Sequence, residues 1–301
     1  MSDAAAEPRN KGPLVFMNYD QDELDRCYDQ SNWAPNTAIV HARTEVNCEI
    51  ARQHLGEPER LSYGPTEIEK LDLFRAEEPN APTMIYVHGG AWRSGTSRRC
   101  HMPAELFVAN GINFIALDFI NVDEAGGSLF PMIEQTRRAV AWVYKNASSF
   151  GADPEKLYVF GHSSGAHLTG NILTTDWPKL HGVPFTILKG GMVTSGMYEL
   201  APVRLSARSK YVNFTDQMVE ELSSIRHIDR LHCPIVVSYG DQESPEFQRQ
   251  NIEFAAAVEK AGKPVKLQVA KGYNHFEIAE TLANPYGLLG RAALELIRTT
   301  R

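Results

Sequence analysis

The chain alternates between short apolar runs and longer segments in which apolar residues recur every three or four positions. Short apolar runs bounded by Gly, Pro or polar residues are typical of strands, and three-to-four spacing is typical of helices with one buried face. Strands are predicted at residues 67–74, 83–88, 112–119, 153–161, 185–191, 234–240 and 265–270. Helices are predicted at residues 98–111, 132–151, 244–262 and 287–299, and three of them end at glycine.

This alternation predicts an α/β fold with a mostly parallel central sheet and helices on both faces. Functional residues are then expected at the carboxyl ends of the strands. We interpret residues 1–301 as a single domain, with residues 192–232 as an excursion that forms a small, partial lid. An N-terminal helical segment, 14–60, is expected to pack on the core through one apolar face, made of Ile39, Val40, Val46, Ile50 and Leu55.

A candidate nucleophile follows the predicted strand at 153–161. Residues 161–165 read Gly-His-Ser-Ser-Gly and fit G-x-S-x-G, with a strand before them and a helix-compatible segment after them. In that context Ser163 would stand on a tight strand-to-helix turn, where flanking side chains would collide with neighbouring elements. A polar turn with a serine helix cap would explain the pentapeptide alone equally well.

A second motif lies at the end of an earlier predicted strand. Residues 88–90 read His-Gly-Gly, and a glycine loop at this place can direct the backbone N–H groups of Gly89 and Gly90 at a substrate oxygen. The N–H of Ser164, the residue after the nucleophile, would complete this oxyanion hole. Both motifs in the required order favour a serine hydrolase over a chance glycine turn.

A serine hydroxyl needs a general base, and the base needs an acid that fixes its tautomer. His275 follows the last predicted strand and precedes a helix, so it can reach the carboxyl edge of the sheet. Three other histidines lie downstream of Ser163 but precede the strand that should deliver the acid: His181, His227 and His232. His275 is therefore the predicted base.

The acid is expected after the strand at 234–240, where the chain offers Asp241, Glu243 and Glu246. Asp241 directly follows Gly240, whereas the acid of such a triad is expected about three residues beyond the glycine, which is the position of Glu243. Glu246 falls in the first turn of a predicted helix, where a carboxylate has a structural use. We favour Glu243 and keep Asp241 as the alternative, because either carboxylate could orient an imidazole.

With these residues in place, the chain resembles the kynurenine formamidase (arylformamidase) branch of the α/β-hydrolase superfamily, near the hormone-sensitive-lipase-like esterases. The resemblance spans most of the chain and rests on SNWAP, YGPTEIEKLDLF, HGGAW, GHSSGAHL, SGMYELAPV, ESPEFQRQ and GYNHFEI. In that family the acid before the S-P-E-F run is an aspartate. Here Glu243 occupies that position, a departure that keeps Asp241 in consideration.

The resemblance implies a cofactor-free hydrolase for a small aromatic N-acyl amide such as N-formylkynurenine. The same machinery could serve a carboxylesterase for aryl or short-acyl esters, or an amidase for a longer acyl group such as N-acetyl. A non-catalytic ligand receptor is a further alternative, and it would predict a disrupted nucleophile, base or oxyanion loop. Four aromatic residues beside the predicted active-site loops could stack on an aryl substrate or pack in the core: Trp92, Phe119, Tyr198 and Phe276.

Composition excludes several other classes. The net charge of −7 argues against a nucleic-acid surface, which needs clustered Lys and Arg. No residue spacing indicates a metal site, and no apolar run is long enough to span a membrane. Residues 1–13 lack the layout of a secretory signal. The four cysteines have no CxxC spacing, which fits reduced packing residues better than a disulfide framework. We expect a cytoplasmic protein with a small-molecule partner, and a homodimer is compatible with the sequence.

Overall fold

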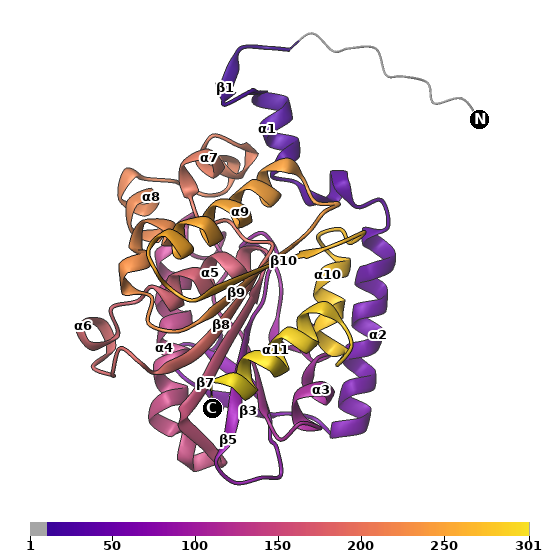
Figure 1. Ribbon diagram of the computed structural model, residues 1–301, viewed down its shortest axis with the longest axis vertical. Coiled ribbons are helices and arrows are strands. Elements are labelled where there is room, and N and C mark those ends of the chain that lie inside the picture. The colour runs from indigo at the N-terminus through magenta and orange to yellow at the C-terminus, as the bar shows by residue number, and fades with distance from the viewer. Residues whose placement is uncertain (1–10, 301) are drawn as a thin grey trace.

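The structure, a computed structural model, describes residues 11–300 (Figure 1). Eight of its strands form one sheet, in the spatial order β10-β9-β8-β7-β5-β6-β4-β3. These strands are β3 (Glu59–Ser62), β4 (Lys70–Phe74), β5 (Ala81–Val87), β6 (Asn113–Leu117), β7 (Ala152–His162), β8 (Leu188–Thr194), β9 (Ile235–Gly240) and β10 (Val265–Ala270). The expectation that residues 1–13 are not a secretory signal falls mostly on residues 1–10, which lie outside the described part of the chain.

The sheet is parallel from β6 through β5, β7, β8 and β9 to β10, while β4 runs antiparallel to both β6 and β3. The prediction of an α/β fold with a mostly parallel central sheet is therefore confirmed. Strand β3 had no counterpart among the predicted strands, since its short Glu-Arg-Leu-Ser sequence carries a single apolar residue.

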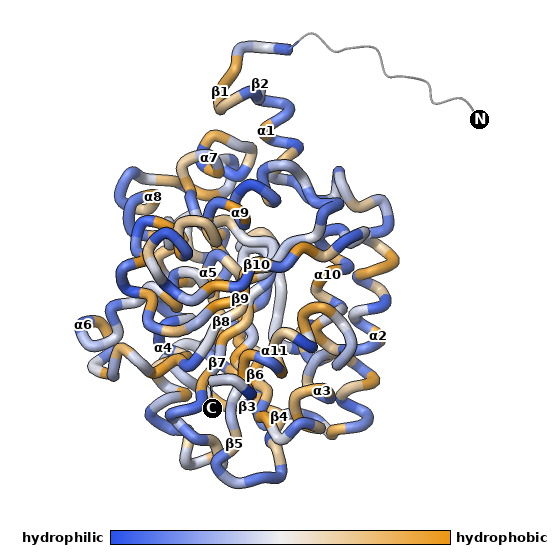
Figure 2. The backbone as a smooth tube through the Cα atoms, viewed as in Figure 1, coloured by the Kyte–Doolittle hydropathy of each residue, from blue (hydrophilic) through white to orange (hydrophobic). Residues whose placement is uncertain are grey.

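Helices cover both faces of the sheet. On one face lie α4 (Phe130–Asn146), α5 (Ser164–Leu173) and α9 (Pro245–Lys260), and on the other lie α3 (Ala104–Val108), α10 (Glu277–Glu280) and α11 (Leu288–Thr299). Alternate residues of each central strand therefore enter different cores: in β7, Val159 packs on the first side and Phe160 on the second. This two-sided burial explains why the central strands read as continuous apolar runs, visible along the sheet in Figure 2.

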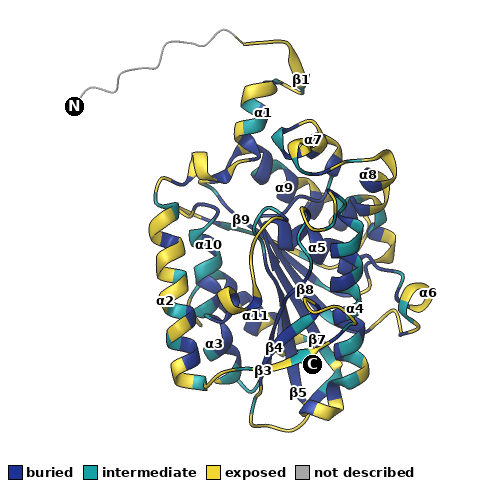
Figure 3. Ribbon diagram, turned by 180° about the vertical axis from the view of Figure 1, so that it is seen from behind, coloured by how far each residue is buried: buried dark blue, intermediate teal, exposed yellow. Residues whose placement is uncertain are grey.

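The N-terminal segment consists of a small hairpin and three helical elements. These are β1 (Leu14–Phe16), β2 (Tyr19–Asp20), α1 (Gln21–Cys27), η1 (Gln30–Trp33) and α2 (Thr37–Leu55). Helix α2 lies against α3 and the short η2 (Ser97–Cys100), and its outward side is exposed in Figure 3.

The predicted buried face of α2 is wrong in two positions. Ile39 and Val46 are 65% and 58% exposed, while Val40, Cys48 and Ala51 are buried. The helix meets its neighbours over a narrow strip in which small residues allow close approach, for example the Met102 N–H that lies 3.3 Å from the Cys48 sulfur. The other three predicted positions are buried or half-buried, namely Val40, Ile50 and Leu55, so the apolar spacing placed only part of the face correctly.

Two further predictions need correction. The helix expected at 98–111 is divided into η2 and the five-residue α3, because Pro103 has no N–H to continue the helical hydrogen bonds. Residues 192–194 belong to β8, so the excursion begins only after Thr194. It then contains α7 (Leu200–Arg204), η4 (Ala207–Lys210), α8 (Asp216–Leu222) and η5 (Ser224–Arg230); the remaining elements are η3 (Ala147–Phe150), α6 (Trp177–His181) and η6 (Thr281–Ala283).

Candidate active site

Ser163 stands on a sharp turn between β7 and α5. Its backbone has φ 60° and ψ −128°, a conformation that side-chain-bearing residues adopt only where the surrounding structure enforces it. A Cβ at Gly161 would lie 2.2 Å from Thr169 Oγ1, and one at Gly165 would lie 2.2 Å from the Val87 carbonyl oxygen. Both glycines of the motif are therefore required by close packing around the turn.

Three side chains from distant parts of the sequence form one hydrogen-bonded series. His275 Nε2 lies 2.8 Å from Ser163 Oγ, and His275 Nδ1 lies 3.0 Å from Glu243 Oε2. With Nδ1 protonated, His275 donates to the carboxylate and accepts from the hydroxyl. All three side chains are buried, so water competes little for these hydrogen bonds.

The other oxygen of the Glu243 carboxylate is also held. Oε1 accepts from the Ser195 hydroxyl at 2.5 Å and from the Gly240 N–H at 2.6 Å. Sequence reasoning missed the role of Ser195: it is the first residue of the SGMYELAPV stretch, but only the pairing of β8 with β9 brings it beside Glu243. Its backbone φ of 56° is a further sign of a constrained position.

Asp241, the alternative acid, points elsewhere. Its Oδ1 accepts from the Gly272 N–H at 2.7 Å, and Lys271 Nζ lies 3.5 Å from its Oδ2. The Gly272 hydrogen bond is the main cause that lowers the pKa of Asp241. The structure thus brings Glu243, and not Asp241, to His275.

The glycine loop lies directly over the Ser163 turn. A Cβ at Gly89 would be 2.8 Å from the His162 carbonyl oxygen and 3.0 Å from Ser163 Cβ. Within residues 11–300, no protein acceptor is bonded to the N–H of Gly89, Gly90 or Ser164. These donors, together with the equally unbonded N–H of Ala91, remain available to an oxyanion.

Hydrogen bonds fix this loop in place. The Trp92 N–H donates to Ser164 Oγ at 3.1 Å, which ties the loop to the start of α5. His88 Nδ1 donates to the Gly89 carbonyl at 2.8 Å, and its ring stacks on Phe119 with centroids 4.2 Å apart. Burial lowers the pKa of His88, so the ring is a neutral structural element.

Like His88, two histidines near the nucleophile have a structural role: His162 lies within the motif, and His167 lies two residues after it. His162 Nε2 donates to the His275 carbonyl at 2.7 Å, and burial lowers the pKa of His162 to about 3. His167 accepts from the Trp92 indole N–H at 3.2 Å and donates to the Leu222 carbonyl at 3.0 Å. Burial lowers the pKa of His167 to about 4, so both rings are neutral near pH 7.

These buried histidines predict acid-sensitive stability. In the unfolded chain both titrate near pH 6.5, whereas in the folded state they titrate near 3 and 4. The unfolded state therefore binds more protons, and the free energy of unfolding falls as the pH drops from about 6.5 toward 4, by about 1.4 kcal/mol per pH unit for each histidine. Urea unfolding at pH 7, 6 and 5 should show a shallower decline for His167→Gln. An unchanged slope in that variant would contradict the assignment.

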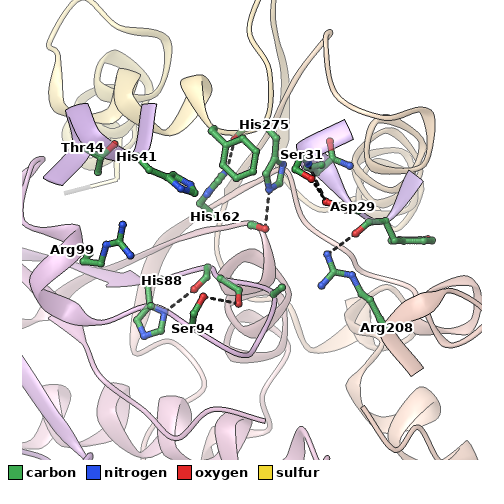
Figure 4. Close-up of a pocket in the computed structure, with 18 of the residues that line it drawn as sticks. Asp29, Ser31, His41, Thr44, His88, Ser94, Arg99, His162, Arg208 and His275 are labelled. Atoms are coloured by element: carbon green, nitrogen blue, oxygen red, sulfur yellow. Dashed lines mark hydrogen bonds between the residues drawn. The ribbon is translucent and has the colours of Figure 1, made fainter. Parts of the chain in front are cut away.

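A cavity of about 520 Å³ opens above the Ser163 turn (Figure 4). Its walls come from the glycine loop, the His275–Phe276 turn, α2, the η4 segment of the excursion and the α1–η1 segment. The N-terminal segment was expected only to pack on the core, yet it supplies Asp25, Asp29 and His41 to this cavity. Sequence reasoning also missed Arg208 and Tyr211, because no motif marks them.

Three of the four predicted substrate-contacting aromatics do not line the cavity. Trp92, Phe119 and Tyr198 are buried and pack in the core, Tyr198 on Phe254 with ring centroids 4.1 Å apart. Their assignment to the substrate pocket is corrected, because their rings pack against other buried side chains of the core. Phe276 alone of the four lines the cavity, edge-on to both His41 and His275.

The described residues contain no cluster of three or more His, Cys, Asp or Glu side chains that could hold a metal ion. Likewise, none of the helices within residues 11–300 has the length and apolar character that a membrane crossing requires.

Comparison with known proteins decides the family. The chain is 31% identical to kynurenine formamidase from Danio rerio over 299 residues, which cover 94% of this chain and 98% of the relative. It belongs to the kynurenine formamidase family. Kynurenine formamidase from Salmo salar is 30% identical over 89% of this chain and 94% of that relative. The chain is accordingly a hydrolase.

Two family models match parts of the chain, and solved esterase structures share its fold. The BD-FAE model matches residues 71–176, and the Carboxylesterase family model matches residues 132–222. Esterase B from Lactobacillus rhamnosis superposes with a TM-score of 0.68 at 15% identity over 90% of this chain and 95% of that one. A thermophilic esterase from Thermogutta terrifontis gives a TM-score of 0.63 at 20% identity over 81% and 93%. Because the sequence identities are this low, these two structures show a shared fold and no shared activity.

Proposed function

We propose that this member of the kynurenine formamidase family is a serine hydrolase for N-formyl aromatic amines, of which N-formylkynurenine is the simplest candidate. The observation that carries the proposal is the hydrogen-bonded series Ser163–His275–Glu243, buried at the floor of a cavity beside unbonded backbone N–H groups. A non-catalytic ligand receptor would be favoured by a disrupted nucleophile, base or oxyanion loop. The geometry of Ser163, His275 and the glycine loop supports no such disruption.

In the proposed mechanism, Ser163 Oγ attacks the formyl carbon while His275 Nε2 takes the hydroxyl proton. The N–H groups of Gly89, Gly90 and Ser164 stabilise the resulting oxyanion, and Glu243 stabilises the imidazolium. His275 then donates its proton to the leaving nitrogen, and the C–N bond breaks to release the arylamine. Water, deprotonated by His275, attacks the formyl-enzyme and releases formate and free Ser163. These residues supply every proton transfer that this sequence of steps needs.

Two observations support a formyl amide as substrate. The relatives that show the family are named kynurenine formamidase. In addition, the Gly89 backbone packs close to Ser163, which suits an acyl group as small as formyl. The larger, open part of the cavity would then receive the arylamine, with Phe276 in its wall.

The test is to measure kcat/KM for N-formylkynurenine, its N-acetyl counterpart and p-nitrophenyl acetate with one preparation. We expect the formyl amide to exceed the acetyl amide by at least about 10-fold, because a formyl group needs almost no acyl pocket, whereas an acetyl group needs room for one more methyl group beside the glycine loop. A carboxylesterase is the second candidate, favoured by the match to the Carboxylesterase family model. Esters faster by orders of magnitude would replace the amide assignment with that one.

We further propose a cytoplasmic location. Cys27, Cys48, Cys100 and Cys233 are free and buried, which suits a reducing compartment. Burial raises the pKa of Cys233 to about 12, so its thiol stays protonated and unreactive near neutral pH. A homodimer remains a prediction, which light scattering of the purified protein would test.

A further inference from the structure

Arg208 places a buried guanidinium in the wall of the active-site cavity. The side chain belongs to η4, is only 7% exposed and lines the cavity. A guanidinium has five N–H donors. Here Nη1 donates to the Tyr211 hydroxyl at 2.7 Å and Nη2 to the Tyr28 carbonyl at 2.8 Å, whereas Nε has no hydrogen-bond partner among residues 11–300. Most of the donor capacity of this cation is therefore unused.

No carboxylate within the described chain neutralises Arg208, since none of its nitrogens has an Asp or Glu oxygen within 4.0 Å. Asp25, on the same wall, is bonded through Oδ1 to the Ala207 N–H at 2.6 Å and to the Gln21 amide. Arg52 is buried to the same extent, but it is paired with Glu49 at 2.6 Å. Because an unpaired buried charge is costly, Arg208 calls for a counter-ion that the protein itself does not supply.

The surroundings of Arg208 hold its position without neutralising its charge. The guanidinium carbon lies 5.2 Å from the centroid of the Trp92 ring, in a cation–π arrangement. With the Tyr211 and Tyr28 hydrogen bonds, this contact orients the guanidinium before any ligand arrives. In Figure 4, Arg208 points into the cavity from the side of Asp29 and Ser31, across from His41 and Arg99. A planar guanidinium held in this way suits bidentate contact with a carboxylate.

We infer that Arg208 binds a carboxylate on the leaving-group portion of the substrate, so that the preferred substrates are anionic formylated arylamines. The inference rests on the proposed function, because a formyl group carries no charge and the carboxylate must then belong to the amine. Asp25 and Asp29 line the same wall, and their charges suit an ammonium group beside that carboxylate. A zwitterionic amino-acid side chain on the arylamine matches this arrangement. Arg208 is thus a specificity-determining residue.

The test compares ligands that differ only in the carboxylate. Kynurenine and its decarboxylated analogue kynuramine are measured as inhibitors of p-nitrophenyl acetate hydrolysis, and kcat/KM is measured for N-formylkynurenine and N-formylkynuramine. Wild-type enzyme should prefer the carboxylated member of each pair by roughly 10- to 100-fold, the value of a charged hydrogen-bonded contact. Arg208→Gln should reduce that preference below about 3-fold, and Arg208→Lys should retain part of it.

The matched control is Arg204→Gln, since Arg204 is exposed, lies four residues earlier and pairs with Asp216 outside the cavity. It should keep the wild-type preference. If Arg208 were only structural, its variants would lose affinity and kcat/KM equally for the carboxylated and the decarboxylated member of each pair. That result would overturn the inference. A selective loss in Arg99→Gln instead of Arg208→Gln would also overturn it.

The inhibition constants separate this inference from the proposed function. If wild-type enzyme fails to cleave either formamide but binds kynurenine more tightly than kynuramine in an Arg208-dependent way, the formamidase proposal fails and the carboxylate site stands. If both formamides are cleaved without preference and both inhibitors bind equally, the carboxylate site is wrong and the formamidase proposal stands.

Discussion

Replacing Ser163 with alanine is expected to lower kcat by about 10⁶-fold, the typical loss when a serine nucleophile is removed from a triad. The mechanism then has no atom that can form the acyl-enzyme. Because Ser163 Oγ makes a single hydrogen bond within the described part of the chain, to His275, and the turn keeps its backbone bonds, the variant should fold. Turnover assays with N-formylkynurenine and p-nitrophenyl acetate measure kcat, and a thermal unfolding curve shows whether the variant is folded.

Ser164→Ala is the matched control for this variant. It keeps the backbone N–H that faces the oxyanion and loses only the hydroxyl that accepts from the Trp92 N–H. One lost hydrogen bond in the loop should cost no more than about 10-fold in kcat. A Ser163→Ala protein that retained wild-type turnover would rule out the acyl-enzyme mechanism, whatever the substrate.

Replacing Glu243 with alanine is expected to lower kcat by about 10⁴-fold, since His275 loses the partner that fixes its tautomer and stabilises its charged form. The change also leaves the Ser195 hydroxyl and the Gly240 N–H without their acceptor, so the melting temperature should fall as well. Kinetics and thermal unfolding on the same preparation separate the two effects. Glu243→Gln, which preserves the shape of the side chain, should recover stability more than activity.

Asp241→Ala provides the comparison. Its carboxylate accepts from the Gly272 N–H and lies near Lys271 at the protein surface, so we expect less than a 3-fold change in kcat and a small loss of stability. If the larger loss of kcat fell on Asp241→Ala, the acid would have to be reassigned. The two variants therefore decide between the carboxylates that sequence reasoning left open.

Much of the fold could be predicted because its signals are local. Strands such as β5 and β9 are buried on both faces, so an uninterrupted apolar run is enough to reveal them. The Gly-His-Ser-Ser-Gly turn is equally local as a sequence pattern, since five consecutive residues between a strand and a helix identify it, although the Val87 carbonyl that Gly165 accommodates belongs to β5. His275 could be named from its place after the last strand.

Other features depend on which distant segments meet. The buried side of α2 follows from its contact with α3 and η2, which apolar spacing does not encode, and the exposed Ile39 and Val46 misled the prediction. Trp92, Phe119 and Tyr198 looked suited to a substrate pocket, yet their neighbours in space make them core residues. An aromatic residue near an active-site loop is compatible with substrate contact and with core packing, and only its neighbours in space distinguish the two roles.

By itself, therefore, the sequence determined the parallel sheet, the nucleophile turn, the glycine loop and the order of the candidate triad along the chain, because periodicity and short motifs each involve only a few consecutive residues. Only the tertiary structure decided which carboxylate meets His275, that Ser195, just after the neighbouring strand β8, holds Glu243, and that Arg208 lies in the cavity wall without a carboxylate partner among the described residues. Those facts depend on hydrogen bonds and charge pairing between segments far apart in the chain, and such contacts leave no periodic trace in the sequence.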